Sequence, residues 1–149
     1  KVGNSTLQYW VILFYSKQLG EVRDFYYIIP YWDIILHAFS AGMLASLGFV
    51  LIGIIKKTGH LKYYLSPFYI ALFSFCFALT MGVIWEIYEY SADGLLSLNM
   101  QKYALADGTK LIGRKALSDT MEDLIVDALS ALVITILGYH QLKKEENTD

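Results

Sequence analysis

The chain has 149 residues, of which 56% are hydrophobic and only 17% are charged, and its mean hydropathy is +0.42. This composition excludes a disordered chain and is unusual for a water-soluble domain of this size. The net charge of −2 offers no basic surface for a phosphate backbone, so we expect no nucleic-acid partner. The single cysteine, Cys76, excludes an intrachain disulfide and a cage of several thiolates. Together these features indicate an integral membrane protein.

The N-terminal segment carries a short apolar stretch from Leu7 to Tyr15, which is only nine residues long. A helix of that length cannot cross the hydrocarbon core by itself. We therefore expect either an interfacial helix or the end of a helix that begins upstream of Lys1.

Two longer apolar runs predict membrane-spanning helices. The first, from Ile34 to Ile55, has 22 residues, which is long enough in a helix to cross the bilayer. The second begins at Ser66 and Pro67, a capping residue followed by a proline that suits the first helical position, and it stays apolar through Trp85.

A third apolar run, Leu124 to Tyr139, has 16 residues, and it becomes a full span if its helix begins near Leu117. We therefore predict an all-α fold, a polytopic transmembrane helix bundle with three spans and an N-terminal interfacial or truncated helix. The chain forms a single membrane domain over residues 1–149. Its parts are a helix remnant and outer segment at 1–30, a three-helix core at 31–140 and a charged tail at 141–149.

Small residues on the predicted spans favour close packing of the helices. They recur at helical spacing on the first and third spans: Ala41, Ala45, Gly48, Ala128 and Ala131. Such faces let helix backbones approach each other in a bilayer. We expect packing within the bundle, with a seam between copies of a homo-oligomer as the alternative.

Basic residues set the predicted orientation. They cluster between the first two spans and after the third, at Lys56, Lys57, Lys62, Lys143 and Lys144. The positive-inside rule places both clusters, and hence the C-terminus, in the cytoplasm. The loop at residues 94–116 then faces outward, although it carries four basic residues of its own: Lys102, Lys110, Arg114 and Lys115.

Acidic residues gather at one end of each predicted span. They are Asp33 in the first, Glu86, Glu89 and Asp93 in the second, and Asp119, Asp123 and Asp127 in the third. Because consecutive spans alternate in direction, all three groups reach the same membrane face. Their spacing places each group on one helix face, with His37 one turn beyond Asp33. Because an ionisable group facing lipid costs about 2.5–3.5 kcal/mol, we expect the three faces to converge inside the bundle.

Seven carboxylates in a pocket of low dielectric require positive partners. The candidates are divalent metal ions, protons, or the side chains of Arg23 or Arg114. One imidazole with several carboxylates suits Zn²⁺, Mn²⁺ or Fe²⁺, whereas an all-oxygen subset suits Mg²⁺ or Ca²⁺. We predict a metal site whose candidate ligands are His37, Glu86, Asp119, Asp123, Asp127 and Asp93. Glu89 is the candidate acid or base, and Asp33 is assigned to orienting His37.

Structural roles compete with these assignments. Asp33 and Asp119 could cap the starts of their helices, with Ser118 as a rival cap for the third. Glu89 and Asp93 could belong to a solvated helix end, and His37 could be a histidine that donates a hydrogen bond between helices.

Three sequence blocks stand out along the chain: YWDIILH at 31–37 with SAG at 40–42, WEIYEY at 85–90, and DTMEDL at 119–124. Together they resemble the YjdF-like family of bacterial inner-membrane proteins. SAG stands where relatives often have Ser-Gly, which is a conservative departure. A remoter similarity to VanZ-like proteins rests on the Asp-x-x-x-His block and the later acidic residues.

What the resemblance implies is limited, because the YjdF-like family is itself largely uncharacterised. It implies a location in the bacterial cytoplasmic membrane, and it covers about residues 20–138. It marks as motif positions Asp33, His37, Glu86, Glu89, Asp119 and Asp123, while Asp93 and Asp127 rest on spacing alone.

Three functions follow as hypotheses. The first is a metal-dependent hydrolase or transferase acting on a lipid phosphate or another cell-envelope amphiphile. The second is proton- or cation-coupled transport, in which the carboxylates form a relay. The third is a non-catalytic accessory subunit of a larger membrane complex. Membrane lipids are expected partners in all three.

Overall fold

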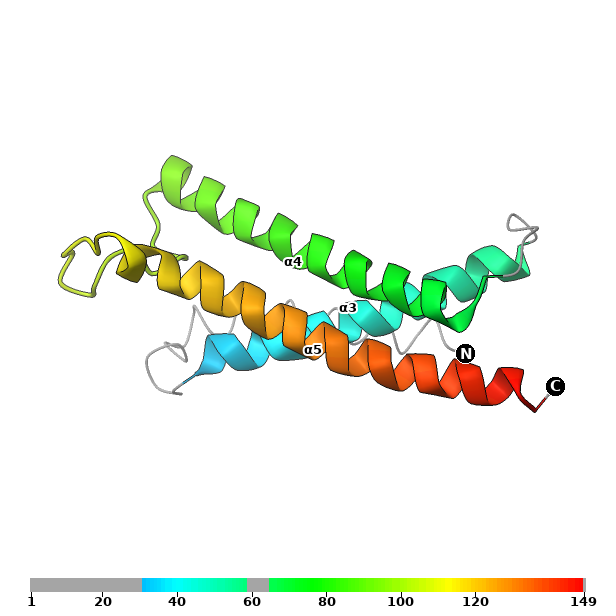
Figure 1. The fold of residues 1–149 in the computed structure, drawn as a ribbon. Helices are drawn as coiled ribbons and strands as arrows, with labels where there is room; N and C mark the ends of the chain where they lie inside the picture. The colour runs from blue at the N-terminus through cyan, green and yellow to red at the C-terminus, as the bar shows by residue number, and fades with distance from the viewer. Residues whose placement is uncertain (1–30, 59–64, 149) are drawn as a thin grey trace.

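Three long helices form the described part of the chain, which comprises residues 31–58 and 65–148 of a computed structural model (Figure 1). They are α3 (Trp32–Lys57), α4 (Pro67–Leu96) and α5 (Arg114–Glu146). The predicted N-terminal helix around Leu7–Tyr15 lies outside the described residues. Within them, the only β pairing is an isolated bridge between Ala104 and Lys110.

The first residues of α3 and α4 can be compared with the predicted capping residues. α4 starts at Pro67 behind Ser66, which confirms the predicted start, although the Ser66 hydroxyl caps no backbone N–H. α3 starts behind Tyr31, so Asp33 lies in the first turn and is not the cap residue.

α5 starts earlier than expected. Its cap residue is Gly113, which has a φ of +63° that favours glycine. Ser118 and Asp119 therefore lie inside the helix, and neither caps it.

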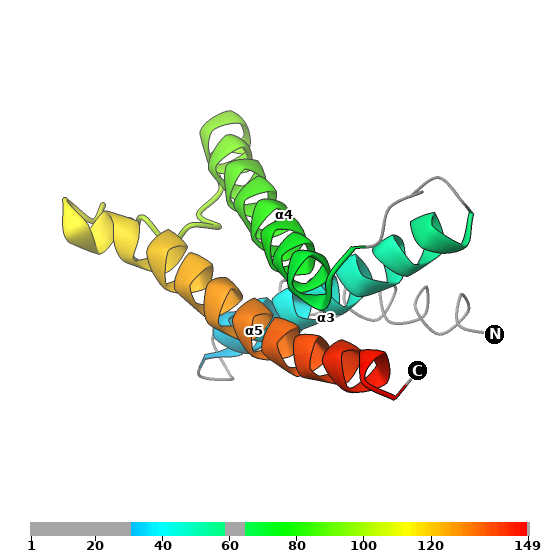
Figure 2. The same cartoon turned by 45° about the vertical axis from the view of Figure 1, so that its right-hand side comes forward.

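The acidic ends of the helices lie together, as predicted. Figures 1 and 2 show the start of α3, the end of α4 and the start of α5 at the same end of the bundle. The loop at residues 97–113 connects α4 to α5 at that end. The helix arrangement therefore brings three separate stretches of sequence to one site.

Small side chains let the three helices contact one another in every pairing. Ala41, Ala45, Gly48 and Ala131 are buried, which confirms the predicted packing faces. The apolar core is a small cluster: Leu44, Ala45, Ala78 and Ala131.

Large apolar side chains cover the outside of the bundle. Ile84, Ile87 and Val133 are about half exposed to the surroundings. Among the described helices, α3 and α4 are long and apolar enough to cross a membrane. The predicted third span corresponds to α5, a continuous helix of 33 residues whose crossing of the membrane stays a prediction.

Candidate metal centre

His37 lies at the centre of the acidic cluster, on the face of α3 that is buried in the bundle. Its Nε2 atom is 4.0 Å from Asp33 Oδ1, 4.0 Å from Glu86 Oε1 and 3.8 Å from Asp123 Oδ2. Its Nδ1 atom is 3.2 Å from Asp127 Oδ1. All three helices thus contribute carboxylates to one imidazole.

The contact with Asp127 determines which nitrogen of the His37 imidazole carries the proton. Because a carboxylate only accepts hydrogen bonds, the geometry assigns the ring proton to Nδ1. The Nε2 lone pair then faces Asp33, Glu86 and Asp123. A carboxylate behind one ring nitrogen is the usual arrangement that orients a metal-binding histidine.

Three of these side chains meet the spacing of a metal site. One ligand atom from each of Asp33, His37 and Asp123 lies within 4.8 Å of the other two. Ligands around a tetrahedral Zn²⁺ lie roughly 3.4 Å apart, so small side-chain movements would close these atoms around an ion.

Two carboxylates in the cluster are almost fully buried. Glu86 is 5% exposed and Asp123 is 2% exposed. Both oxygens of Glu86, and Oδ2 of Asp123, have no hydrogen-bond partner within the described part of the chain. Because a buried charge is costly unless it is paired, these oxygens indicate the place of a cation or proton.

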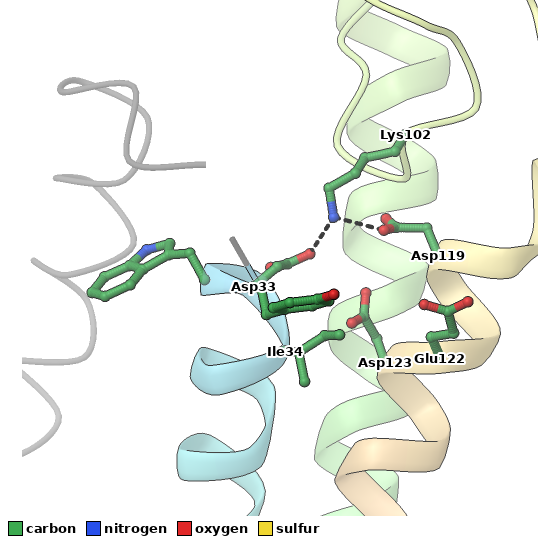
Figure 3. Close-up of a pocket in the computed structure, with 8 residues that line it drawn as sticks. Asp33, Ile34, Lys102, Asp119, Glu122 and Asp123 are labelled. Carbon is green, nitrogen blue, oxygen red and sulfur yellow. Dashed lines mark hydrogen bonds and ion pairs between the residues drawn. The ribbon is translucent and has the colours of Figure 1, made fainter. Parts of the chain in front are cut away.

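A lysine from the connecting loop closes the outer side of the cluster. Lys102 Nζ donates to Asp33 Oδ2 at 2.7 Å and to Asp119 Oδ1 at 2.6 Å (Figure 3). Burial by itself would lower the pKa of Lys102, but the hydrogen bonds and charges of Asp119 and Asp33 outweigh it and raise that pKa above its usual range. The side chain therefore remains a cation at physiological pH.

A cavity of about 200 Å³ opens beside this lysine. The residues that line it come from the start of α3, from the loop and from the N-terminal part of α5: Tyr31, Trp32, Asp33, Ile34, Lys102, Asp119, Glu122 and Asp123. Asp33, Asp119 and Asp123 line the cavity and also belong to the cluster, so a ligand in it would lie beside the imidazole–carboxylate group.

Glu89 and Asp93 have other contacts. Glu89 Oε1 accepts a hydrogen bond from Trp85 Nε1 at 2.6 Å. Asp93 accepts hydrogen bonds from the backbone N–H groups of Met100 at 2.7 Å and Gln101 at 3.0 Å. Both carboxylates are buried, so the interpretation of a solvated helix end is wrong. Asp93 fixes the loop that carries Lys102.

The structure changes two assignments within the predicted set. Asp127, predicted as a ligand, lies behind the imidazole, whereas Asp33, predicted to orient it, faces Nε2. In the described part of the chain, Lys102 is the cation that contacts the cluster, whereas Arg114, one of the two basic candidates, begins α5 and is exposed. Arg23 lies outside the described residues. The one signal for Lys102 in the sequence was an excess of basic residues in a loop on the acidic face.

Two helices that could span a membrane and a buried group of carboxylates around one histidine define a helical membrane protein with a candidate metal centre. The chain belongs to the family described as "Predicted membrane protein (DUF2238)", whose sequence pattern matches residues 4–144. This membership confirms the predicted class of protein. The family description names no activity and no ligand, and the resemblance to YjdF-like and VanZ-like proteins stays a prediction.

One curated relative is an "Uncharacterized protein" from Thermotoga maritima, which is 27% identical over 130 residues. The alignment covers 87% of this chain and 58% of the relative, so the chain spans less than two thirds of the length of that protein. No solved structure matches the chain.

Proposed function

We propose that this protein binds a divalent metal ion at the membrane face where its three helices bring their acidic residues together. The ligands are His37 through Nε2, Asp33 and Asp123, with Glu86 as a fourth. Asp127 orients the imidazole from the other side of the ring. The observation that carries the proposal is the group formed by Asp33, His37 and Asp123, whose ligand atoms lie within 4.8 Å of one another.

The buried oxygens of Glu86 and Asp123 support the proposal, because a divalent ion would give them the positive partner that hydrogen bonds do not supply. The mixed set of one imidazole and several carboxylates favours Mn²⁺, Fe²⁺ or Zn²⁺ over Mg²⁺ and Ca²⁺, which prefer oxygen ligands alone.

We propose further that the site serves a hydrolase or transferase of the bacterial cytoplasmic membrane that acts on a phosphorylated amphiphile. A bound metal would supply an activated water or polarise a phosphoryl oxygen. The cavity beside Lys102 supports this proposal, because it gives a headgroup access to the cluster. Glu89 is retained as a candidate acid or base, although its bond to Trp85 does not require that role.

The metal content of the purified protein tests the first step. After incubation with MnCl₂ or ZnCl₂ and removal of free metal, the wild type should retain about one equivalent or more by elemental mass spectrometry. His37→Ala and Asp123→Asn should each lose it. His140→Ala and Asp107→Asn are matched controls, because both side chains are exposed, neither is a proposed ligand and neither lines the cavity. A wild type that retains no metal, or ligand variants that retain all of it, would contradict the proposal.

The other hypotheses have less support. A relay for transport needs titratable groups that continue through the bundle. Apart from the cluster, and from Glu89 and Asp93 near the acidic end of α4, the buried polar side chains among the described residues are Ser74 and Thr135. Each of these two hydroxyls donates to a carbonyl of its own helix. A role as an accessory subunit, or assembly into a homo-oligomer, predicts a stoichiometric partner or a second copy that copurifies in mild detergent.

A further inference from the structure

The carboxylate of Asp33 faces two positions at once. Its Oδ1 atom lies 4.0 Å from His37 Nε2, at the proposed metal site. Its Oδ2 atom accepts the hydrogen bond from Lys102 Nζ at 2.7 Å. Carboxylates that bridge two cations in this way hold the ions of two-metal centres about 3.5–4 Å apart.

The position of the Lys102 ammonium offers more acceptor oxygens than the lysine uses. Asp119 binds Nζ through Oδ1, and its Oδ2 atom is buried without a hydrogen-bond partner in the described residues. Lys102 itself uses two of its three N–H donors on Asp33 and Asp119. Two carboxylates around one cation position form a set that a metal ion could also use.

The charge of the cluster favours more than one cation. Five carboxylates lie around the imidazole and the ammonium: Asp33, Glu86, Asp119, Asp123 and Asp127. When all five are ionised, one divalent ion offsets only part of their negative charge, and the Lys102 ammonium offsets a further part. We infer that the centre holds two cations, of which the chain supplies one: the Lys102 ammonium occupies the position between Asp33 and Asp119. One metal ion then binds per chain, and removal of the ammonium opens a second metal site.

The loop holds Lys102 at this position through its own contacts. The backbone of Lys102 has a φ of +46°, in the left-handed region that a lysine rarely adopts. The preceding residues Met100 and Gln101 are bound to Asp93, and Gln101 Nε2 donates to Thr120 Oγ1 at 2.8 Å. Because the two residues before Lys102 are bound to α4 and α5, the loop holds the ammonium at the site.

This inference rests on the proposed metal site, and metal stoichiometry tests it. Wild type, Lys102→Met, the double variant Lys102→Met with Asp119→Asn, and the control Lys110→Met are incubated with excess MnCl₂ and separated from free metal. We expect about one equivalent in the wild type and the control, about two in Lys102→Met, and about one again in the double variant. Lys110 is an exposed lysine of the same loop, so its loss should change nothing.

Metal contents that differ from these expectations would contradict either the inference or the proposed function. Two equivalents in the wild type, or one in a folded Lys102→Met protein, would overturn the inference while leaving the proposed metal site intact. No metal in any of the four proteins would overturn the proposed function itself. If Lys102→Met does not fold, the electron paramagnetic resonance spectrum of manganese in the wild type distinguishes a centre with one metal ion from a centre with two. An isolated ion supports the inference, and a spin-coupled pair contradicts it.

Discussion

Asp127 reaches His37 because residue 82 on the facing helix has no side chain. A Cβ atom added at Gly82 would collide with Asp127 Oδ2. We predict that Gly82→Ala displaces the carboxylate from the imidazole and weakens metal binding by about 10- to 100-fold, the usual cost of losing a partner that orients a ligand. Metal titration of the purified variant, read as a dissociation constant, measures this effect.

Gly94→Ala is the matched control, because a Cβ at that position on the same helix meets no atom within 4 Å. Its metal affinity should equal that of the wild type. An unchanged affinity in Gly82→Ala would show that the contact between Asp127 and His37 does not orient the ligand.

Individual residues also show where prediction from sequence ends. The pairing of Asp33 with His37 could be predicted, because the two are one helical turn apart. The bond between His37 and Asp127 joins residues 90 positions apart. Its geometry depends on how α3 and α5 are rotated against each other, and the spacing within one helix does not contain that information.

At the scale of helices, α3 and α4 lie in close contact at Gly48. A Cβ there would lie 2.6 Å from the backbone Cα of Ser74, so the helices would have to separate. We predict that Gly48→Ala lowers the free energy of unfolding by about 1–3 kcal/mol, the usual cost of overpacking a core. Thermal unfolding in detergent, compared with the wild type, gives the direction and size of the change.

Gly53→Ala provides the comparison on the same helix, because a Cβ atom at that position would meet no atom within 4 Å. The substitution should be neutral or slightly stabilising, since alanine favours the helix over glycine by up to about 1 kcal/mol. Equal stability of the two variants would mean that the small-residue face does not bring the helices together.

The helices were more predictable than the loop between α4 and α5. Apolar runs and the Ser66–Pro67 start located the middle of each helix correctly. The start of α5 could not be predicted, because it depends on the backbone conformation of Gly113. A single backbone conformation leaves no periodic pattern of apolar residues in the sequence. Lys102 was missed for the same reason, since its position depends on contacts made by Asp93 and by the loop itself.

At the scale of the whole molecule, the acidic end and the C-terminus lie at opposite ends of α5 (Figure 1). The cluster therefore faces the opposite side of the membrane from the C-terminus only if α5 crosses the bilayer. The predicted orientation places the loop at residues 97–113 outside and the C-terminus in the cytoplasm. Both statements can be tested with single cysteines on either side of α5.

We predict that Thr109→Cys, in a Cys76→Ser background, reacts in intact cells with a maleimide that does not cross membranes. Asn147→Cys in the same background should react only after the cells are permeabilised. Both positions are exposed, so access of the reagent depends on the side of the membrane and not on burial. Labelling of both cysteines in intact cells, or of neither, would mean that α5 does not separate the two sides. The reverse pattern would keep α5 as a span and place the cluster at the cytoplasmic face, where a cytoplasmic headgroup or a soluble phosphate could reach it.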